Sequence, residues 1–490
     1  MADHEALKIL RDDLGADSVS CEEAARREYQ PLRGSPPPAV VRIRDADSLV
    51  RTVRWAREHK TPLLPVSSSA PHHDACLAAP PGAVMVDLSG MKRVIQTNRR
   101  NRVTLVEAGV SFEELVPVAQ QNGLRALLPL MPRRGKSMLA SYLDREPTIY
   151  PKYQWDFADP LLCIELVYGT GDLFRTGSAA GPGTIEEQWR SKEFQKNPLG
   201  PGQGDWVKLV QGAQGGIGIA TWCSAKCEVL PRRERLFVAG AERIEPLVEA
   251  SYRQLHRKLT DIHFLLDRRA LASLVTKTPE DLERAAAAAS AWNLVYSVSG
   301  IEYFPEEREA YLAREAEKEV RAQGARLVGP PLVSEAELLA ALLHPDGSVH
   351  WRNRARGGHR SVYFLTTMDQ AGRFDAVFDG LADRNGIDGG RVLRYLQPLI
   401  GGRACHLEYV VAADPADAAD LEKVDAFCAQ AARPLIEAGA FFSRPHGAWS
   451  QPAMEHAQSS LWIYRKMKDI FDPDHILAPG RLTLGESRAA

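Results

Sequence analysis

The sequence predicts an α+β protein with at least two folded regions. The first observation is a β–α–β pattern: VVRI from Val40 reads as a short strand, Ser48 to His59 as an amphipathic helix, and PLLPVS as a second strand. The second is the tract QGAQGGIGIAT, 211–221, in which glycines run into β-branched residues typical of a strand. The third is a change of composition after Pro231, beyond which strand and helix patterns alternate again. A second domain is therefore expected there.

Size and charge describe an ordinary globular protein. At 490 residues the chain has room for two large domains or about three of average size. Its composition is 44% hydrophobic and 25% charged, and its net charge of −2 provides no positive field to attract nucleic acid or anionic lipid. The sequence shows neither a secretory signal nor a run of about eighteen apolar residues, and its seven cysteines are scattered. We expect a cytoplasmic protein with reduced thiols and no membrane span.

The remaining elements of the first region follow in order. GAVMVDLSGMKRVI and RVTLVEAGV, within 82–110, read as strands, and Ser111 with Glu114 forms a capping box that opens a helix. LLCIELVYGTGDLFRTG, 161–177, has the pattern of a strand-turn-strand hairpin. No GxGxxG follows a strand and opens a helix, and no GxxxxGK[ST] occurs, so nicotinamide and ATP binding are disfavoured.

The second region repeats strand and helix signals without a sequence repeat. Its predicted strands are LFVAG, WNLVYSVSG, VYFLTTM and HLEYVVAAD. Its predicted helices are one ending near Leu259, an alanine run at 285–289, a charged helix over 305–323, a capped helix from Ser334 and a long helix up to Gly439. Pro434 should interrupt that last helix, and Pro473 should stop a further helix in the tail.

Six segments, taken in their order, resemble a known family. They are PVSSSAPHH, GAVMVDLSGM, RVTLVEAGV, LVYGTGDLFRTG, QGAQGGIGIAT and FDPDHILAPGRL, and the resemblance covers nearly the whole chain. The sequence is similar to the vanillyl-alcohol oxidase and p-cresol methylhydroxylase (PCMH) flavoproteins. This resemblance implies a two-subdomain FAD-binding domain of the PCMH type, formed by residues 1–231 and by a returning segment at 441–490. Residues 232–440 would form an α+β cap domain that roofs the flavin ring and selects the substrate.

The resemblance also implies where FAD is held, with its pyrophosphate on the loop after Pro65 and further contacts from 132–141 and 215–219. The residues expected to bind the cofactor are Ser67, Ser68, Ser69, Ala70, Pro71, His72, Pro132, Ser137, Ser141, Gly215, Gly216, Gly218, Ile219, Arg444 and Arg481. The chain departs from the family in PVSSSAPHH, which has no glycine, so serine hydroxyls would supply part of the phosphate contact. Covalent attachment of flavin through His72 or His73 is one alternative, and histidines that only form hydrogen bonds are the other.

Oxidation of a C–H bond by flavin needs a group that handles the substrate's proton and a positive charge beside the reduced ring. Arg444 lies in SRPH, which resembles the Tyr-Arg-Thr-His segment of phenol-oxidising relatives, although Ser443 stands where they carry tyrosine. Its permanent charge suits an anionic hydroquinone. The other catalytic candidates are Asp156, at the spacing of an aspartate near flavin N5 in relatives, and Tyr150, Tyr153 and His406. The alternatives are a surface ion pair for the arginine, a turn for the aspartate, and packing for the tyrosines and the histidine.

These features predict an FAD-dependent oxidase or dehydrogenase that transfers hydride from a small aromatic alcohol or alkylphenol to flavin N5. A hydroxy-acid dehydrogenase of the same fold is an alternative, although its HxxxDGN-like metal-binding stretch is not found and no metal is expected. A flavin-poor, non-catalytic subunit or scaffold of a larger redox complex is another. The electron acceptor stays open among O₂, a quinone, a cytochrome and an electron-transfer flavoprotein, as does a homo-oligomeric state.

Overall fold

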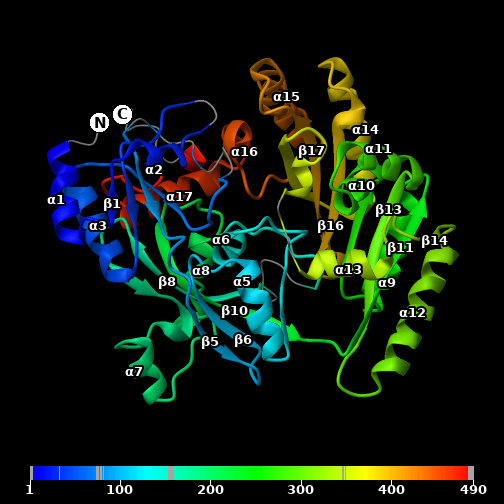
Figure 1. Cartoon of the computed structure of the whole chain (residues 1–490), viewed down its shortest axis with the longest axis horizontal. Helices are drawn as coiled ribbons and strands as arrows, with labels where there is room; N and C mark the ends of the chain where they lie inside the picture. Colours follow the sequence, from blue (N-terminus) through cyan, green and yellow to red (C-terminus); the bar gives the residue numbers. More distant parts are fainter. Residues whose placement is uncertain are drawn as a thin grey trace.

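The computed structural model describes residues 4–31, 34–72, 77, 80, 82–152, 159–344, 347 and 349–483. The chain forms two halves that lie side by side, with both termini in the first half (Figure 1). The strands up to β10 and the C-terminal helices build the first half, and the elements from β11 to α15 build the second. The predicted α+β class is confirmed.

The first half begins with a small sheet whose strand order is β1–β2–β4–β3. The strands are β1 (Val19–Ser20), β2 (Val40–Arg42), β4 (Val84–Asp87) and β3 (Leu63–Val66). Because β2, β4 and β3 run parallel and α3 (Ala46–Glu58) connects β2 to β3, the predicted β–α–β unit is confirmed. Two more helices, α1 (His4–Leu14) and α2 (Glu23–Arg27), flank β1 in the sequence. Trp55 Nε1 ties α3 to α1 by donating a 2.8 Å hydrogen bond to the Ala6 carbonyl.

A second, antiparallel sheet follows, ordered β5–β6–β10–β8–β9, with β7 also paired to β10. Its strands are β5 (Val94–Asn98), β6 (Val103–Glu107), β7 (Leu124–Ala126), β8 (Leu161–Tyr168), β9 (Leu173–Arg175) and β10 (Gly218–Val229). The predicted hairpin is β8 with β9. The predicted capping box is present, since Ser111 and Glu114 each bond the other's backbone N–H at the start of α5 (Phe112–Gln121). The helices α6 (Met138–Leu143), α7 (Ile185–Arg190) and α8 (Val207–Val210) complete this part.

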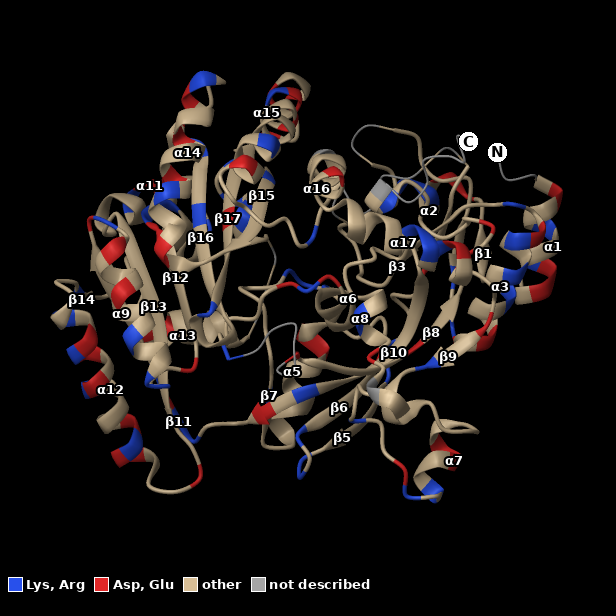
Figure 2. Ribbon diagram, turned by 180° about the vertical axis from the view of Figure 1, so that it is seen from behind, with Lys and Arg blue, Asp and Glu red and all other residues tan. Residues whose placement is uncertain are grey.

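The second half is a seven-stranded antiparallel sheet ordered β14–β11–β13–β12–β16–β17–β15. Its strands are β11 (Arg233–Ala241), β12 (His263–Asp267), β13 (Trp292–Gly300), β14 (Arg326–Val328), β15 (Gly358–Thr366), β16 (Val392–Leu399) and β17 (Ala404–Ala413). Its helices are α9 (Glu245–His256), α10 (Arg268–Val275), α11 (Pro279–Ala288), α12 (Pro305–Ala322), α13 (Glu335–Leu343), α14 (Ala371–Arg384) and α15 (Ala418–Glu437). Charges of both signs follow one another along α12, the predicted charged helix (Figure 2).

The break expected at Pro434 is wrong, because α15 continues through this residue to Glu437. A proline removes one backbone donor and crowds the carbonyl four residues before it. Here it lies in the last turn of a 20-residue helix, so the turns before it keep their hydrogen bonds and the helix ends within four residues.

Successive residues of the seven-stranded sheet pack into two different hydrophobic cores, one on each face of the sheet. Leu265 of β12 packs with residues of α9, α12, α14 and α15. Its neighbours Phe264 and Leu266 face the other way, into the core shared with the first half. With both faces buried, β12 shows no alternation of polar and apolar residues.

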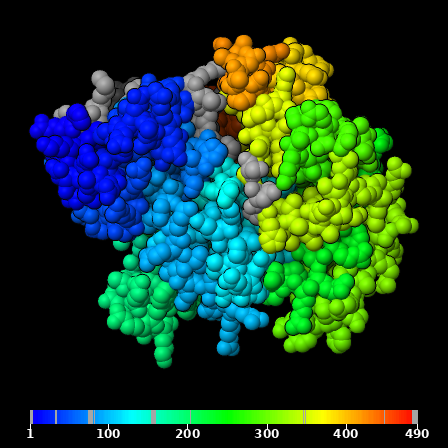
Figure 3. Space-filling model, viewed as in Figure 1, coloured from blue at the N-terminus to red at the C-terminus, as the bar shows by residue number. Residues whose placement is uncertain are grey.

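The two halves lie against each other (Figure 3). Trp351, which is 1% exposed, donates from Nε1 to the Leu130 carbonyl at 3.2 Å. The backbone N–H of His263 donates to the Ile149 carbonyl at 3.0 Å. These bonds join the second half directly to the first half.

Acidification should weaken the structure through His263. Burial of this imidazole lowers its pKa to about 3, whereas the unfolded value is about 6.5. The unfolded state therefore binds the proton more readily, and stability falls as the pH drops from about 6.5 toward about 3, by roughly 1.4 kcal/mol per pH unit for this group. In chemical unfolding, the free energy of unfolding of His263→Gln should fall less steeply with pH over this range than that of the wild type. The variant His256→Gln, at an exposed position, should follow the wild type. If the free energy of unfolding changes with pH equally steeply in H263Q and the wild type, this expectation is contradicted.

The chain returns to the first half through α16 (Ser450–His456) and α17 (Gln458–Phe471) (Figure 1). α17 ends just before Pro473, as predicted. Leu477 then forms a parallel bridge with Leu63 at the start of β3, and Lys468 Nζ donates to the Gly216 carbonyl at 2.7 Å. The end of the chain is thereby fixed to the glycine-rich tract. Across the described residues, every helix is too short or too polar to span a lipid bilayer.

Candidate functional site

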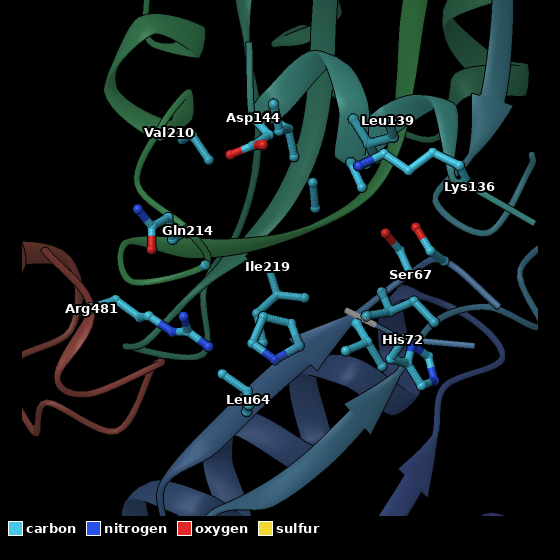
Figure 4. Close-up of a pocket in the computed structure, with 18 of the residues that line it drawn as sticks. Leu64, Ser67, His72, Lys136, Leu139, Asp144, Val210, Gln214, Ile219 and Arg481 are labelled. Atoms are coloured by element: carbon cyan, nitrogen blue, oxygen red, sulfur yellow. The ribbon is translucent and has the colours of Figure 1, made fainter. Parts of the chain in front are cut away.

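A cavity opens where four segments meet (Figure 4). The loop at 67–72 is here called the serine loop; with the end of β3 it supplies Leu64, Pro65, Val66, Ser67, Ser68 and His72. The stretch 133–144 supplies Arg133, Lys136, Leu139, Ala140, Leu143 and Asp144. The glycine-rich tract and β10 supply Gln214, Gly215, Gly218, Ile219 and Ala220, and the C-terminal segment supplies His446 and Arg481. The cavity encloses about 1170 Å³ including its open mouth.

The glycine-rich tract lies against Pro65 because position 215 has no side chain. Gly215 has a φ of +79°, and a Cβ added there would lie 2.6 Å from Pro65 Cγ. The tract leads directly into β10 at Gly218, where the sequence predicts a strand. This close approach shapes one wall of the cavity.

Gly215→Ala should therefore cost more stability than Gly212→Ala. The two glycines share a positive φ, +79° and +76°, but an added Cβ at Gly212 meets no atom of the described residues within 4 Å. Placing alanine at a positive φ costs about 1–2 kcal/mol at either position. The clash with Pro65 should add about 1–3 kcal/mol at position 215 alone. The free energies of unfolding of the two variants measure the difference. Equal losses would show that Pro65 does not constrain the tract.

The serine loop is fastened to residues 133–137, here called the cation loop. The Ser69 N–H donates to the Gly135 carbonyl at 3.0 Å, and the Ser137 N–H donates to Ser68 Oγ at 3.0 Å. Arg133 Nη1 donates to the Ser69 carbonyl at 2.7 Å. Ser137 Oγ also caps α6 by accepting from the N–H of its third residue. The two loops therefore act as one unit in the cavity wall.

His72 lies at the end of the serine loop with unused hydrogen-bonding capacity. Its ring stacks on Tyr29 at a centroid distance of 4.8 Å, and its buried Nε2 has no hydrogen-bond partner within the described chain. Burial, helped by the charge of Arg133, lowers its pKa to about 4. A neutral imidazole that lines the cavity in this way suits contact with a cofactor. His73 lies outside the described residues.

Arg444 is buried at the junction of the two halves and is 5% exposed. Its Cζ lies 4.4 Å from the centre of the Tyr363 ring. Its Nη2 donates to His406 Nδ1 at 3.2 Å, and its Nη1 is 3.8 Å from an Asp144 oxygen. Its Nε is buried and has no hydrogen-bond partner among the described residues. A permanent cation held this way attracts an anionic group.

His406 is fixed between two charged groups. Because its Nδ1 accepts from Arg444, its ring proton is on Nε2, which lies 3.3 Å from Glu408. Arg352 holds both oxygens of Glu408, at 2.7 and 2.6 Å. Burial lowers the pKa of His406 to about 4. Burial would raise the pKa of Glu408, but Arg352 and His406 keep it well below its ordinary value. His406 thus orients Arg444 as a neutral hydrogen-bond acceptor.

An aspartate–histidine pair lines the cavity beside Arg444. His446 Nε2 is 3.0 Å from Asp144 Oδ1, although 302 positions separate the two residues. Burial would raise the pKa of Asp144, but His446 and Arg444 lower it to about 2. The ionised carboxylate accepts from Nε2–H, which leaves His446 Nδ1 able to take a proton. Asp144 carries no local sequence signal, whereas His446 belongs to the SRPH segment that also holds Arg444.

The structure gathers only part of the predicted cofactor set around the cavity. The predicted residues that line it are Ser67, Ser68, His72, Gly215, Gly218, Ile219 and Arg481. Those that support its wall through hydrogen bonds are Ser69, Ser137 and Gly216. Pro132 and Ser141 are buried, with Ser141 Oγ donating to Glu146, and Ala70 and Pro71 are exposed.

The predicted catalytic residues are also divided. Arg444 and His406 contact each other beside the cavity. Tyr150 is buried beneath the Arg125 guanidinium, whose Cζ lies 4.6 Å from the centre of the Tyr150 ring. Tyr150 is not part of the cavity lining. Burial raises the pKa of Tyr150 well above its ordinary value. Asp156 and Tyr153 lie outside the described residues.

Comparison with known proteins identifies the cofactor-binding part. Residues 37–176 match the family model described as FAD binding domain. This part of the chain is similar to FAD-binding domains. Its fold, taken with the rest of the chain, resembles the crystal structure of p-cresol methylhydroxylase with substrate bound, with a TM-score of 0.81 at 19% identity over 98% of this chain and 96% of that one. The predicted PCMH-type fold and the FAD cofactor are confirmed.

Two relatives of known name match part of the chain. The 4-cresol dehydrogenase [hydroxylating] flavoprotein subunit of Pseudomonas putida is 26% identical over 190 residues, which are 37% of this chain and 36% of the relative. The mitochondrial D-lactate dehydrogenase [cytochrome] of Arabidopsis thaliana is 24% identical over 204 residues, 42% of this chain and 32% of the relative. The chain spans about a third of the length of these two relatives. Both are named dehydrogenases, in agreement with the predicted class of FAD-dependent oxidoreductase.

The residues of the cavity fit FAD. Arg133, Lys136 and Arg481 bring positive charge to match the pyrophosphate, and apolar side chains such as Leu64 and Leu139 match a flat ring system. The unpartnered Nε2 of His72 and the close approach at Gly215 are features expected of a wall that receives a ligand.

Proposed function

We propose that the chain is an FAD-dependent oxidoreductase of the vanillyl-alcohol oxidase type that oxidises a small aromatic alcohol or alkylphenol. The observation that carries this proposal is the buried Arg444, held by His406 and placed beside the Asp144–His446 pair. A phenol that loses its proton gives an oxyanion, which the guanidinium can bind while a neighbouring base takes the proton. Both groups are present here within one cluster.

Aromatic side chains around Arg444 support an aromatic substrate. Tyr363 lies under the guanidinium and meets Trp449 edge to face at 5.4 Å. Phe442 packs against the same tryptophan at 6.1 Å. Aromatic rings pair favourably in such geometries, so a ring entering this region meets compatible neighbours.

The roles of the polar residues follow from their geometry. Arg444 binds the substrate oxygen, and His406 with Glu408 keeps the guanidinium in position. His446 accepts the hydroxyl proton at Nδ1, because Asp144 holds the other nitrogen protonated. Bound FAD supplies the hydride acceptor, N5 of its ring.

A hydroxy acid is the second candidate substrate, and the likeness to D-lactate dehydrogenase favours it. An arginine binds a carboxylate as readily as a phenolate. The two candidates differ in what surrounds the charge, because a small hydroxy acid makes no use of the aromatic neighbours. A non-catalytic scaffold is less supported, since it needs no buried cation next to a proton acceptor.

Replacement of His446 tests the proposed proton transfer. His446→Gln and Asp144→Asn should slow anaerobic reduction of the flavin by an alkylphenol roughly 10²-fold at neutral pH, as expected on loss of a positioned base. The deficit should shrink as the pH approaches about 10, where a phenol ionises in water and needs no base. Arg433→Gln, an exposed arginine paired with Glu455, is the control and should reduce at the wild-type rate. A deficit that stays constant with pH would exclude His446 as the proton acceptor.

A further inference from the structure

The serine loop cannot bind a phosphate as a glycine-rich loop does. It has no glycine, and the Ser69 N–H is already used in a hydrogen bond to the Gly135 carbonyl. Ser68 Oγ accepts from the Ser137 N–H. FAD nevertheless carries a pyrophosphate with two negative charges, and burying them without neutralisation is costly. The charge must be balanced by other groups in the cavity.

Among the described residues, three cationic side chains line the cavity, and two of them come from the cation loop beside the serine loop. These two are Arg133 and Lys136, and the third is Arg481. Figure 4 shows Lys136 and Ser67 on one side of the cavity and Arg481 on the opposite side. Ser67 and Lys136 therefore share one side, and Arg133 is hydrogen-bonded to the serine loop at Ser69. Together these groups can surround a single anionic group.

Arg133 is positioned by the serine loop itself. It is 9% exposed, and its Nη1 donates to the carbonyls of Ser69 and Arg134, at 2.7 and 3.1 Å. Its charge contributes to the lowered pKa of His72 in the same wall. The positive potential of Arg133 thus reaches the surface of the cavity.

Lys136 is held near the cavity by a loose ion pair. Its Nζ lies 3.4 Å from Glu146, and its side chain is 20% exposed. Glu146 keeps a second partner in Ser141 Oγ, at 2.8 Å. Lys136 can therefore turn toward an arriving anion without leaving the carboxylate alone.

Gly135, between the two cations, allows the loops to meet. It has a φ of +73°, and an added Cβ would lie 3.1 Å from Ser69 Cβ. The glycine needed for close backbone approach is supplied here by the cation loop, and the serine loop needs none.

We propose that Arg133 and Lys136 bind the FAD pyrophosphate by charge, together with the serine loop, in place of a glycine-rich phosphate loop. Arginine offers planar paired donors to phosphate, and lysine acts as a point charge. This assignment concerns the cofactor alone and does not depend on which substrate the enzyme oxidises.

Binding of FAD to protein stripped of flavin tests the proposal, followed by the change in flavin fluorescence without any substrate. Arg133→Gln and Lys136→Gln should each weaken FAD binding about 10- to 100-fold, the range for a hydrogen bond to a charged group. Arg134→Gln is the matched control, because its side chain is 69% exposed and pairs with Glu113 away from the cavity; its FAD affinity should stay within about twofold of wild type. Affinity for riboflavin, which has no phosphate, should be the same in all four proteins.

Salt and a conservative variant complete the test. Added NaCl should weaken FAD binding to the wild type more steeply than to Lys136→Gln, because a charge pair is lost. Arg133→Lys keeps the charge but not the fork that reaches Ser69, and it should bind FAD more tightly than Arg133→Gln does. The proposal is overturned if riboflavin affinity falls as much as FAD affinity, if neither variant weakens FAD binding, or if R133K binds FAD as poorly as R133Q.

Discussion

Replacing Lys468 with Met is expected to lower the free energy of unfolding by about 3–5 kcal/mol, the cost of leaving a buried charge without its partner. Lys468 is 1% exposed and donates to three oxygens: Asp472 Oδ2 at 2.5 Å and the carbonyls of Leu477 and Gly216 at 2.6 and 2.7 Å. Asp472 is fully buried and also accepts from the N–H of Leu477. The lysine therefore joins the end of the chain to the glycine-rich tract.

Chemical unfolding of Lys468→Met measures this loss, which is a large part of the 5–15 kcal/mol that stabilises a typical domain. Lys466→Met, an exposed position on the same helix, should stay within about 0.5 kcal/mol of wild type. Adding Asp472→Asn to K468M removes the orphaned charge and should recover part of the loss. A variant K468M as stable as K466M would show that the ion pair does not hold the end of the chain to the glycine-rich tract.

Replacing Arg444 with Met should lower kcat/KM for flavin reduction by about 10²–10³-fold, the loss expected when one preorganised donor to an oxyanion is removed. Methionine keeps much of the volume over the Tyr363 ring but removes the charge and the bond to His406. Lysine at this position restores charge without the planar fork, so Arg444→Lys should recover part of the rate. FAD binding to R444M should persist, because the cation loop is unchanged.

Stopped-flow reduction under anaerobic conditions compares these variants with Arg433→Met, which alters an arginine 69% exposed to solvent. The control should keep the wild-type rate. If R444M and R433M reduce equally fast with every substrate that reduces the wild type, the cluster around Arg444 has no part in the chemistry.

Local signals in the sequence were sufficient for elements whose residues contact near neighbours. The β–α–β unit and the β8–β9 hairpin have short connections, and the capping box at Ser111 and Glu114 spans three residues. The strands β12 and β16 were not predicted, because buried faces on both sides remove the alternation that reveals a strand.

The candidate site depends on contacts that no local pattern carries. Asp144 and His446 meet across 302 positions, and Arg444 reaches His406 across 38. The resemblance pointed to Arg444 and His406, but the aspartate follows the short helix α6 in a stretch without any motif. The resemblance implied FAD contacts within 132–141, but not the contact of this stretch with the serine loop, since Gly135 and Ser69 become neighbours only when the loops fold together.

Anaerobic mixing of the FAD-loaded protein with one reductant at a time tests the proposed function most directly. The reductants are 4-ethylphenol, vanillyl alcohol, D-lactate and D-2-hydroxyglutarate, and the signal is the visible absorption of oxidised flavin. The buried Arg444, its aromatic neighbours and the Asp144–His446 pair predict rapid bleaching by the two phenols and slow or no bleaching by the two hydroxy acids. Bleaching by the hydroxy acids alone, or by none of the four, would contradict the proposed function.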